Sequence, residues 1–115
     1  MIQLDAPIDA AVIERVAIIT INRPARRNAI DHDTLVRLGE ALEQVAATDV
    51  QVLVLTGASG HFCAGADLTS LEDIAFTDRL RTVLDRLVDL PIPTIAAISG
   101  SCMGLGIQLA IACDI

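Results

Sequence analysis

One stretch of the chain decides the fold: Thr94-Ile-Ala-Ala-Ile-Ser-Gly-Ser-Cys-Met-Gly-Leu-Gly-Ile-Gln-Leu-Ala-Ile-Ala-Cys-Asp-Ile115. A β-branched apolar run meets a turn that contains Gly100, Gly104 and Gly106, and an apolar stretch of helical character follows. A strand, a glycine-rich turn and a helix in this order place free backbone N–H groups at the positive end of a helix. That end can hold a phosphate, or an oxygen that becomes negative during a reaction.

The rest of the chain alternates between strand-like and helix-like segments, which is typical of an α/β fold. The pattern predicts strands over residues 12–22 and 50–56, the second apolar on both sides and therefore buried. Asp31 or Asp33 can cap a helix that follows the first strand. The other expected elements are a turn at Pro24, a loop over residues 57–67, a short helix begun by Asp67 or Thr69, and a helix over residues 78–90. The side chains expected to face inward are Leu35, Leu38, Leu42 and Val45 in the first helix and Leu80, Val83, Leu84, Leu87 and Val88 in the last.

Composition limits the class of protein. A chain of 115 residues forms one domain at most, or part of a larger one. Hydrophobic residues make up 53% and the mean hydropathy is +0.59, so some faces are expected to lie against further protein. No apolar run reaches the roughly 20 residues that span a bilayer. The first residues also lack the features of a signal peptide, so we expect a cytoplasmic protein without a membrane span.

Charge and cysteine content exclude further classes. The net charge of -7 argues against a nucleic-acid surface, although Arg23, Arg26 and Arg27 could hold an anion locally. The three cysteines have no metal-ligand spacing, which predicts reduced thiols and no metal site.

The spacing of glycines in this turn allows two interpretations. The spacing Gly100-x-x-x-Gly104-x-Gly106 after a strand is used by short-chain dehydrogenases for a dinucleotide pyrophosphate. Those enzymes also rely on a Tyr and Lys pair, and this chain contains neither residue type. In the other interpretation, the glycines only permit a tight turn and close helix–strand packing.

Three segments are informative when taken together: Val16-Ala-Ile-Ile-Thr-Ile-Asn-Arg-Pro-Ala-Arg-Arg-Asn-Ala-Ile-Asp31, Val52-Leu-Val-Leu-Thr-Gly…Phe62-Cys-Ala-Gly-Ala-Asp-Leu68, and Leu90-Pro-Ile-Pro-Thr-Ile-Ala-Ala-Ile-Ser-Gly100…Cys113-Asp-Ile115. In their order and spacing they resemble the enoyl-CoA hydratase/isomerase (crotonase) family. Family members are considerably longer. The resemblance therefore implies that residues 1–115 form the N-terminal part of a crotonase-like spiral of strand–strand–helix units, incomplete at its C-terminus.

The resemblance also implies a function. Members of the family bind acyl-CoA thioesters and stabilise a thioester enolate with two backbone amides, which match those of Ala66 and Leu105. Coenzyme A is part of the substrate, so no separate cofactor is expected, and trimers are typical of the family. The residues that match the substrate-binding positions are Arg27 and Ala29 near the nucleotide end, and Ala64, Gly65, Ala66, Asp67, Leu68, Met103, Gly104 and Leu105 along the pantetheine and acyl thioester.

Two residues depart from the family pattern. Glycine is usual where Leu105 stands, so a leucine is expected to add backbone strain or to narrow the pocket. Gln108 aligns with the first of two catalytic glutamates, and the second falls after residue 115. Glutamine can orient a water molecule, but it cannot transfer a proton near neutral pH.

The remaining polar residues offer no replacement for the glutamates. We expect Glu72, Asp73, Asp85 and Asp89 on solvated faces, and Asp114 as a structural carboxylate at a strand end. We expect Asp67 to cap a helix rather than to act as a catalytic acid. His32 and His61 are expected to face solvent, and Cys63 to be buried and neutral.

Two hypotheses follow. In the first, the chain binds acyl-CoA thioesters and keeps the two-amide enolate site without its usual proton-transfer residues. In the second, the chain is a truncated, non-catalytic remnant or subunit whose exposed apolar edge needs a partner chain.

Overall fold

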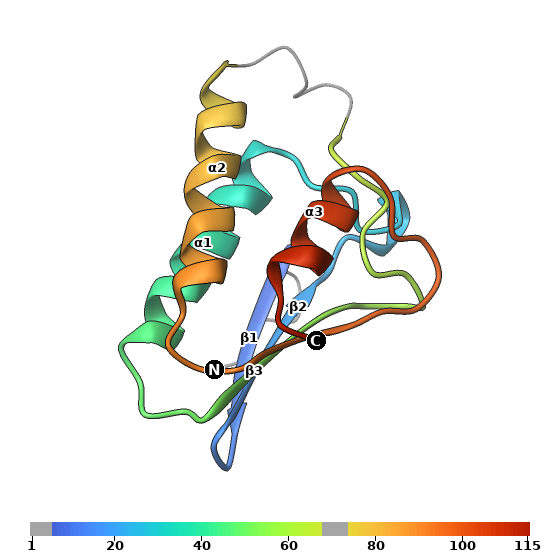
Figure 1. Cartoon of the computed structure of the whole chain (residues 1–115). Coiled ribbons are helices and arrows are strands. Elements are labelled where there is room, and N and C mark those ends of the chain that lie inside the picture. The colour runs from blue at the N-terminus through green and yellow to red at the C-terminus, as the bar shows by residue number, and fades with distance from the viewer. Residues whose placement is uncertain (1–5, 68–73) are drawn as a thin grey trace.

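The computed structural model describes residues 6–67 and 74–115 of the chain. Within these residues, a four-stranded mixed sheet carries three α-helices and one short 3-10 turn (Figure 1). In chain order the elements are β1 (Ile8–Ile13), β2 (Val16–Ile21), η1 (Pro24–Arg26), α1 (His32–Ala46), β3 (Val52–Gly57), α2 (Ile74–Asp89), β4 (Thr94–Ala97) and α3 (Leu105–Ala112).

The sheet has the order β1-β2-β3-β4, which confirms the predicted α/β class. β1 is antiparallel to β2, whereas β2, β3 and β4 are parallel neighbours. Parallel strands need a long crossover, and here α1 connects β2 to β3 while α2 connects β3 to β4. Among the described residues, no helix has the length and apolar character that crossing a membrane requires.

The prediction of a single strand over residues 12–22 is wrong. A hairpin pairs Ile13 with Val16 and Ile8 with Ile21, and Glu14 takes a left-handed conformation with φ 57° at its turn. Apolar β-branched residues continue on both sides of the turn, and no glycine or asparagine marks it. The run of apolar residues therefore gave no sign that the chain reverses direction at this point.

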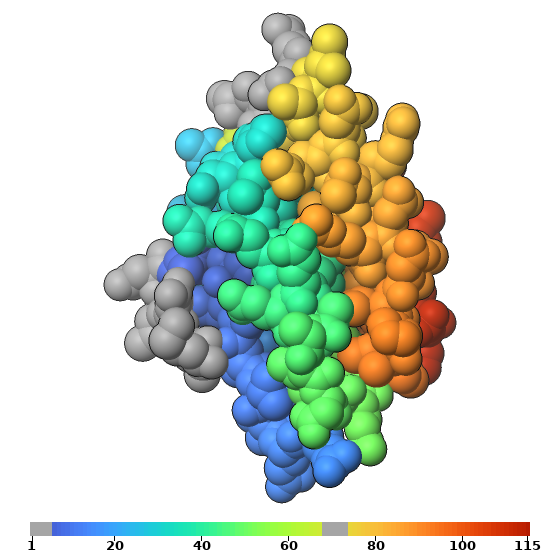
Figure 2. Space-filling model, turned by 90° about the vertical axis from the view of Figure 1, so that its left-hand side faces the viewer, coloured from blue at the N-terminus to red at the C-terminus, as the bar shows by residue number. Residues whose placement is uncertain are grey.

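The core lies between one face of the sheet and the helices α1, α2 and α3. The inward positions expected for α1 are buried, as are Val83 and Leu87 of α2, and Figure 2 shows the two helices side by side. Val88 is 62% exposed, so its inward placement was wrong, because it lies about 100° around the helix from Leu87. The expectation that β3 is buried on both faces is also wrong, since only Leu53 and Leu55 are buried in it.

Asp31, rather than Asp33, caps α1. Its Oδ1 accepts hydrogen bonds from the Thr34 N–H at 2.9 Å and the Thr34 hydroxyl at 2.6 Å. Burial raises the pKa of the Asp31 carboxyl, but these hydrogen bonds and the Arg23 guanidinium outweigh it, so the pKa lies below its ordinary value. Asp33 is exposed and pairs with Arg37 at 3.0 Å one turn along the helix.

We expect Asp31→Ala to lower the free energy of unfolding by about 1 kcal/mol in urea denaturation at pH 7, because α1 loses its N-cap. Asp33→Ala is the matched control and should cost about 0.3–0.5 kcal/mol, as an exposed helical ion pair does. The folded pKa of Asp31 is lowered, so its contribution is present above 3.8 and is lost as the pH falls further. The gap between wild type and Asp31→Ala should therefore narrow below that pH. Equal loss in both variants, or a gap independent of pH, would contradict the capping role.

Candidate functional site

Two loops that are distant in the sequence meet beside the sheet. One is the loop after β3 and the other connects β4 to α3. The Phe62 N–H donates to the Ser99 carbonyl at 2.8 Å, and the Cys63 N–H donates to the Ser101 carbonyl at 3.0 Å. The Met103 N–H then donates to the Cys63 carbonyl at 3.1 Å. These bonds form a short parallel ladder that fixes the two loops side by side.

Two glycines permit this close contact. A Cβ on Gly100, which has φ 58°, would overlap the Gly60 carbonyl oxygen. A Cβ on Gly106, in the first turn of α3, would overlap the Cys63 carbonyl oxygen. At these two positions the packing interpretation of the glycine-rich turn is correct.

A third segment, residues 27–31, lies along the first loop. The Ile30 N–H donates to the Gly65 carbonyl at 2.9 Å, and the Asp67 N–H donates to the Ile30 carbonyl at 2.8 Å. This pattern pairs Ile30 with Ala66 in a parallel bridge. Ile30 bonds to Gly65 and Asp67, the residues on either side of Ala66. Ala66 itself makes no bond to Ile30 in such a bridge, and its N–H points away from Ile30.

The amides of Ala66 and Leu105 are among the backbone N–H groups without an acceptor where the loops meet. Neither the Ala66 N–H nor the Leu105 N–H donates to another residue of the described ranges. Leu105 is the first residue of α3, whose N-cap, Gly104, supplies no side chain. A Cβ on Gly104 would lie 3.9 Å from the Cα of Gly65, so the residues that precede the two amides are in contact.

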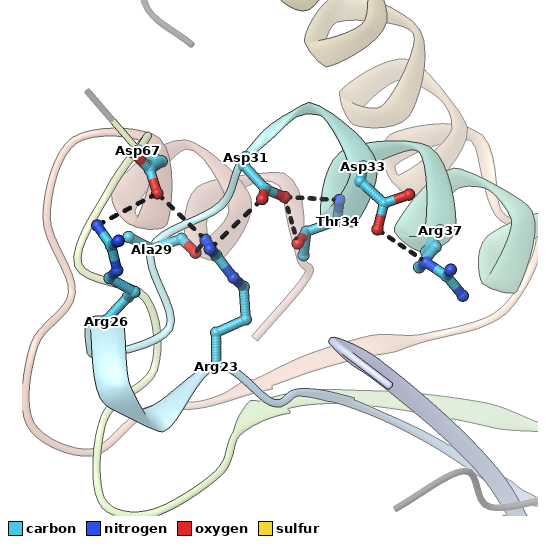
Figure 3. Close-up of polar contacts among 8 residues, drawn as sticks. All are labelled: Arg23, Arg26, Ala29, Asp31, Asp33, Thr34, Arg37 and Asp67. Atoms are coloured by element: carbon cyan, nitrogen blue, oxygen red, sulfur yellow. Dashed lines mark hydrogen bonds and ion pairs between the residues drawn. The ribbon is translucent and has the colours of Figure 1, made fainter. Parts of the chain in front are cut away.

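Ion pairs connect Asp67, at the end of the first loop, to the η1 turn (Figure 3). The Asp67 carboxylate lies 3.5 Å from the Arg23 guanidinium and 3.8 Å from that of Arg26. Arg23 also pairs with Asp31 at 3.4 Å and donates to the Ala29 carbonyl at 2.6 Å. One guanidinium therefore connects the η1 turn, the start of α1 and the residue after Ala66.

The chain was compared with protein families, with related proteins and with solved structures. The family model described as "Enoyl-CoA hydratase/isomerase" matches residues 12–115. The chain belongs to the enoyl-CoA hydratase/isomerase family. It is 42% identical over 109 residues to the Bos taurus "Enoyl-CoA hydratase domain-containing protein 2, mitochondrial". The matched region covers 87% of this chain and 36% of that protein.

A second relative and a solved structure extend the match. The Escherichia coli (strain K12) "2,3-dehydroadipyl-CoA hydratase" is 40% identical over 107 residues, which are 89% of this chain and 42% of that protein. The crystal structure of an "enoyl-CoA hydratase/carnithine racemase" from Magnetospirillum magneticum superposes with a TM-score of 0.90 at 34% identity. It covers 96% of this chain and 45% of that chain, so the fold is crotonase-like and this chain spans less than half of these relatives.

The residues that the resemblance matches to substrate-binding positions lie on the three segments described above, apart from Leu68. The Ala64 N–H donates to the Arg27 carbonyl at 3.0 Å, so these two residues are neighbours. Arg27 is exposed and has φ 50°. Met103 is 55% exposed beside the junction of the loops, whereas Leu68 lies outside the described residues.

Leu105 and Gln108, the two departures from the family pattern, lie in the first half of α3. The expected backbone strain at Leu105 is wrong, because the left-handed φ of 53° belongs to Gly104 and Leu105 begins the helix. The Leu105 side chain is 5% exposed and packs in the core. Gln108 is exposed and follows Leu105 by one turn of α3.

Asn28 is a structural residue that the sequence analysis missed. It is fully buried, and its side-chain amide donates to the Ala58 carbonyl at 2.9 Å and the His61 carbonyl at 2.6 Å. Its Oδ1 accepts from the Arg23 N–H at 2.8 Å. The only local signal is an asparagine in a proline-containing turn, where left-handed backbone is common, and Asn28 has φ 63°.

The two histidines are half-buried rather than solvent-facing, which corrects that prediction. His61 Nδ1 accepts a hydrogen bond from the Ser101 N–H at 3.0 Å and so supports the contact between the loops. The His32 ring meets Phe76 edge-on, with ring centroids 6.2 Å apart.

The structure shows where three of the other acidic residues lie. Asp85 and Asp89 are exposed on α2, as predicted, while Glu72 and Asp73 lie outside the described ranges. Asp114 accepts from the Thr94 N–H at 2.9 Å, which agrees with a structural role. Within residues 6–67 and 74–115, no group of histidines, cysteines and carboxylates could hold a metal ion.

We expect Gly106→Ala to lower the free energy of unfolding by about 1–3 kcal/mol, because the added methyl group overlaps the Cys63 carbonyl and pushes α3 away from the first loop. Ile111→Ala, on the same helix and 76% exposed, is the control and should change stability by less than about 0.5 kcal/mol. Urea denaturation measures both. An unaltered midpoint for Gly106→Ala would show that the contact between α3 and the loop is not tight.

Proposed function

We propose that this chain binds acyl-CoA thioesters and polarises the thioester carbonyl through the backbone amides of Ala66 and Leu105. The observation that carries the proposal is the pair of amides without acceptors on two loops in contact. Two N–H groups that converge on one oxygen stabilise the negative charge of an enolate, and backbone donors are already oriented before the reaction.

The two donors differ in origin. The Leu105 amide belongs to the N-terminus of α3, where the helix dipole adds a partial positive charge of about half an elementary charge. The Ala66 amide is oriented by its neighbours, because the ladder with Ile30 uses the groups on either side of it. Neither donor depends on a side chain, so the leucine at position 105 retains the donor that family members supply from glycine.

The residues around these amides supply the rest of the substrate site in this proposal. Ala64, Gly65 and Asp67 on one loop, and Met103 and Gly104 on the other, follow the pantetheine and acyl groups, and the resemblance adds Leu68 to this set. Arg27, exposed at the edge of the site, provides a guanidinium for a phosphate near Ala29. This substrate class is supported by the similarity to the bovine enoyl-CoA hydratase domain-containing protein and to the Escherichia coli 2,3-dehydroadipyl-CoA hydratase.

The described residues offer no group to transfer a proton at the acyl chain. Gln108 stands where the family places a glutamate, and a carboxamide cannot act as acid or base near pH 7. Its amide can orient water or a polar acyl group. The chemistry proposed for these residues is therefore binding and polarisation of the thioester.

The test is isotope-edited infrared spectroscopy of an acyl-CoA labelled with ¹³C at the thioester carbonyl. We expect the carbonyl band to move to lower wavenumber on binding, because two hydrogen bonds weaken the C=O bond. Ala66→Pro removes one donor without removing a ladder hydrogen bond, and it should reduce this shift. Ala66→Ser keeps the N–H and is the matched control.

Calorimetric titration separates binding from polarisation. Absence of heat at millimolar acyl-CoA would contradict the binding proposal. Binding with an unshifted carbonyl band, or with equal bands in Ala66→Pro and Ala66→Ser, would contradict the role of the amides.

A second candidate function is association with further protein through α3. The helix packs against α2 on one side (Figure 1), yet Ile107 is 48% and Ile111 is 76% exposed on another. Met103 and Ile115, which precede and follow the helix in the chain, are also exposed, at 55% and 77%. An apolar helix face of this kind favours the hypothesis of a subunit that needs a partner chain or another copy of itself.

We expect the chain to self-associate in sedimentation velocity, in a manner that depends on its concentration. Replacing both Ile107 and Ile111 by Gln should leave it monomeric, because the α3 surface loses its apolar character. Val88→Gln, on α2 and 62% exposed, is the control and should still associate. A wild-type chain that stays monomeric, or a double variant that associates equally, would contradict the role of α3.

A further inference from the structure

Two cysteines lie opposite each other where the loops meet. The Cys63 N–H donates to the Ser101 carbonyl at 3.0 Å, and the Met103 N–H donates to the Cys63 carbonyl at 3.1 Å. This pattern pairs Cys63 directly with Cys102 in a parallel bridge. Adjacent strands lie about 4.8 Å apart, and residues paired in this way direct their side chains to the same face. A disulfide joins Cα atoms about 4.4–6.8 Å apart, so the backbone spacing is suitable.

The surroundings of the two thiols place both against the same core. Cys63 is fully buried, and Cys102 is half-buried and packs against the same cluster of apolar side chains. Burial raises the pKa of the Cys63 thiol to about 11, and the neighbouring Cys102 adds to the increase while a hydrogen bond to Gly65 opposes it. The influence of Cys102 on this titration agrees with thiols on the same side of the ladder.

The third cysteine lies elsewhere. Cys63 touches Gly106 in the first turn of α3, whereas Cys113 follows the last residue of that helix. Seven residues of helical rise separate positions 106 and 113, which corresponds to about 10 Å. Cys113 is therefore an internal control for any reaction between the other two thiols.

We propose that Cys63 and Cys102 form a reversible internal disulfide that links the loop after β3 to the loop before α3. The oxidant is a small-molecule disulfide. The Cys102 thiolate attacks one of its sulfurs and releases one small thiol, which leaves a mixed disulfide on Cys102. The Cys63 thiolate then attacks the Cys102 sulfur and releases the second small thiol. The protein loses two hydrogens, and the small disulfide is reduced to two thiols.

The burial of the two thiols sets the order of the steps. Cys102 is the more accessible thiol and reacts with the oxidant first. Cys63 is buried, and only a small fraction of its thiol is ionised at neutral pH. Closure of the disulfide by the Cys63 thiolate is therefore the slow step. Below the pKa of Cys63, the rate of closure should rise about tenfold for each pH unit. The proposal is independent of acyl-CoA binding.

The experiment treats the folded, reduced chain with oxidised glutathione and follows it by intact mass and by peptide mapping without reduction. We expect a species that has lost two hydrogens, a peptide that links Cys63 to Cys102, and a free Cys113. Dithiothreitol should restore all three thiols. Cys113→Ser is the matched control and should form the same link, whereas Cys63→Ser should stop at the glutathione adduct on Cys102.

Three results would overturn the proposal. The first is separate glutathione adducts on Cys63 and Cys102 with no link between them in the wild-type chain. The second is a link that involves Cys113. The third is reaction only under denaturing conditions, since that would show that the folded loops hold the thiols apart. The wild-type map decides the matter even if a serine variant fails to fold.

Discussion

The whole site depends on backbone hydrogen bonds on both edges of one short loop, residues 62–67. Cys63 bonds to the segment before α3, and the groups on either side of Ala66 bond to Ile30. Gly65, with φ 125°, lies between these two contacts and allows the chain to change its hydrogen-bonding partner. A buried loop must satisfy its backbone polar groups, and four of the six N–H groups of residues 62–67 donate to neighbouring backbone carbonyls. The amides of Gly65 and Ala66 have no acceptor among the described residues.

Side chains reinforce this backbone arrangement from the η1 turn. Arg23 reaches both Asp31 and Asp67, and its side chain is only 19% exposed, so these charges interact with little screening by solvent. Asn28 is buried beside it and binds two carbonyls of the loop after β3. The turn, the cap of α1 and the loop therefore form one connected unit. We therefore expect a change in any of these three parts to alter the position of the Ala66 amide.

The sequence predicted the class of fold and most elements, because apolar periodicity reports local burial directly. It identified the helix after the first strand, with Asp31 or Asp33 as its cap, and the last strand–turn–helix, and the family resemblance indicated the loop at Ala66. It missed the hairpin at Glu14, where no turn residue interrupts the apolar run. It also missed the buried roles of Asn28 and His61, since their partners lie about 30–40 residues away in the chain and no local pattern encodes such contacts.

In the proposed function, the amides of Ala66 and Leu105 donate to the same thioester oxygen. The most direct measurement is a titration of the ¹⁵N-labelled chain with an acyl-CoA, followed by amide resonances in two-dimensional NMR spectra. We expect both amide protons to move downfield together and to saturate at the same ligand concentration. Saturable binding that leaves either of these two amide resonances unmoved would contradict it.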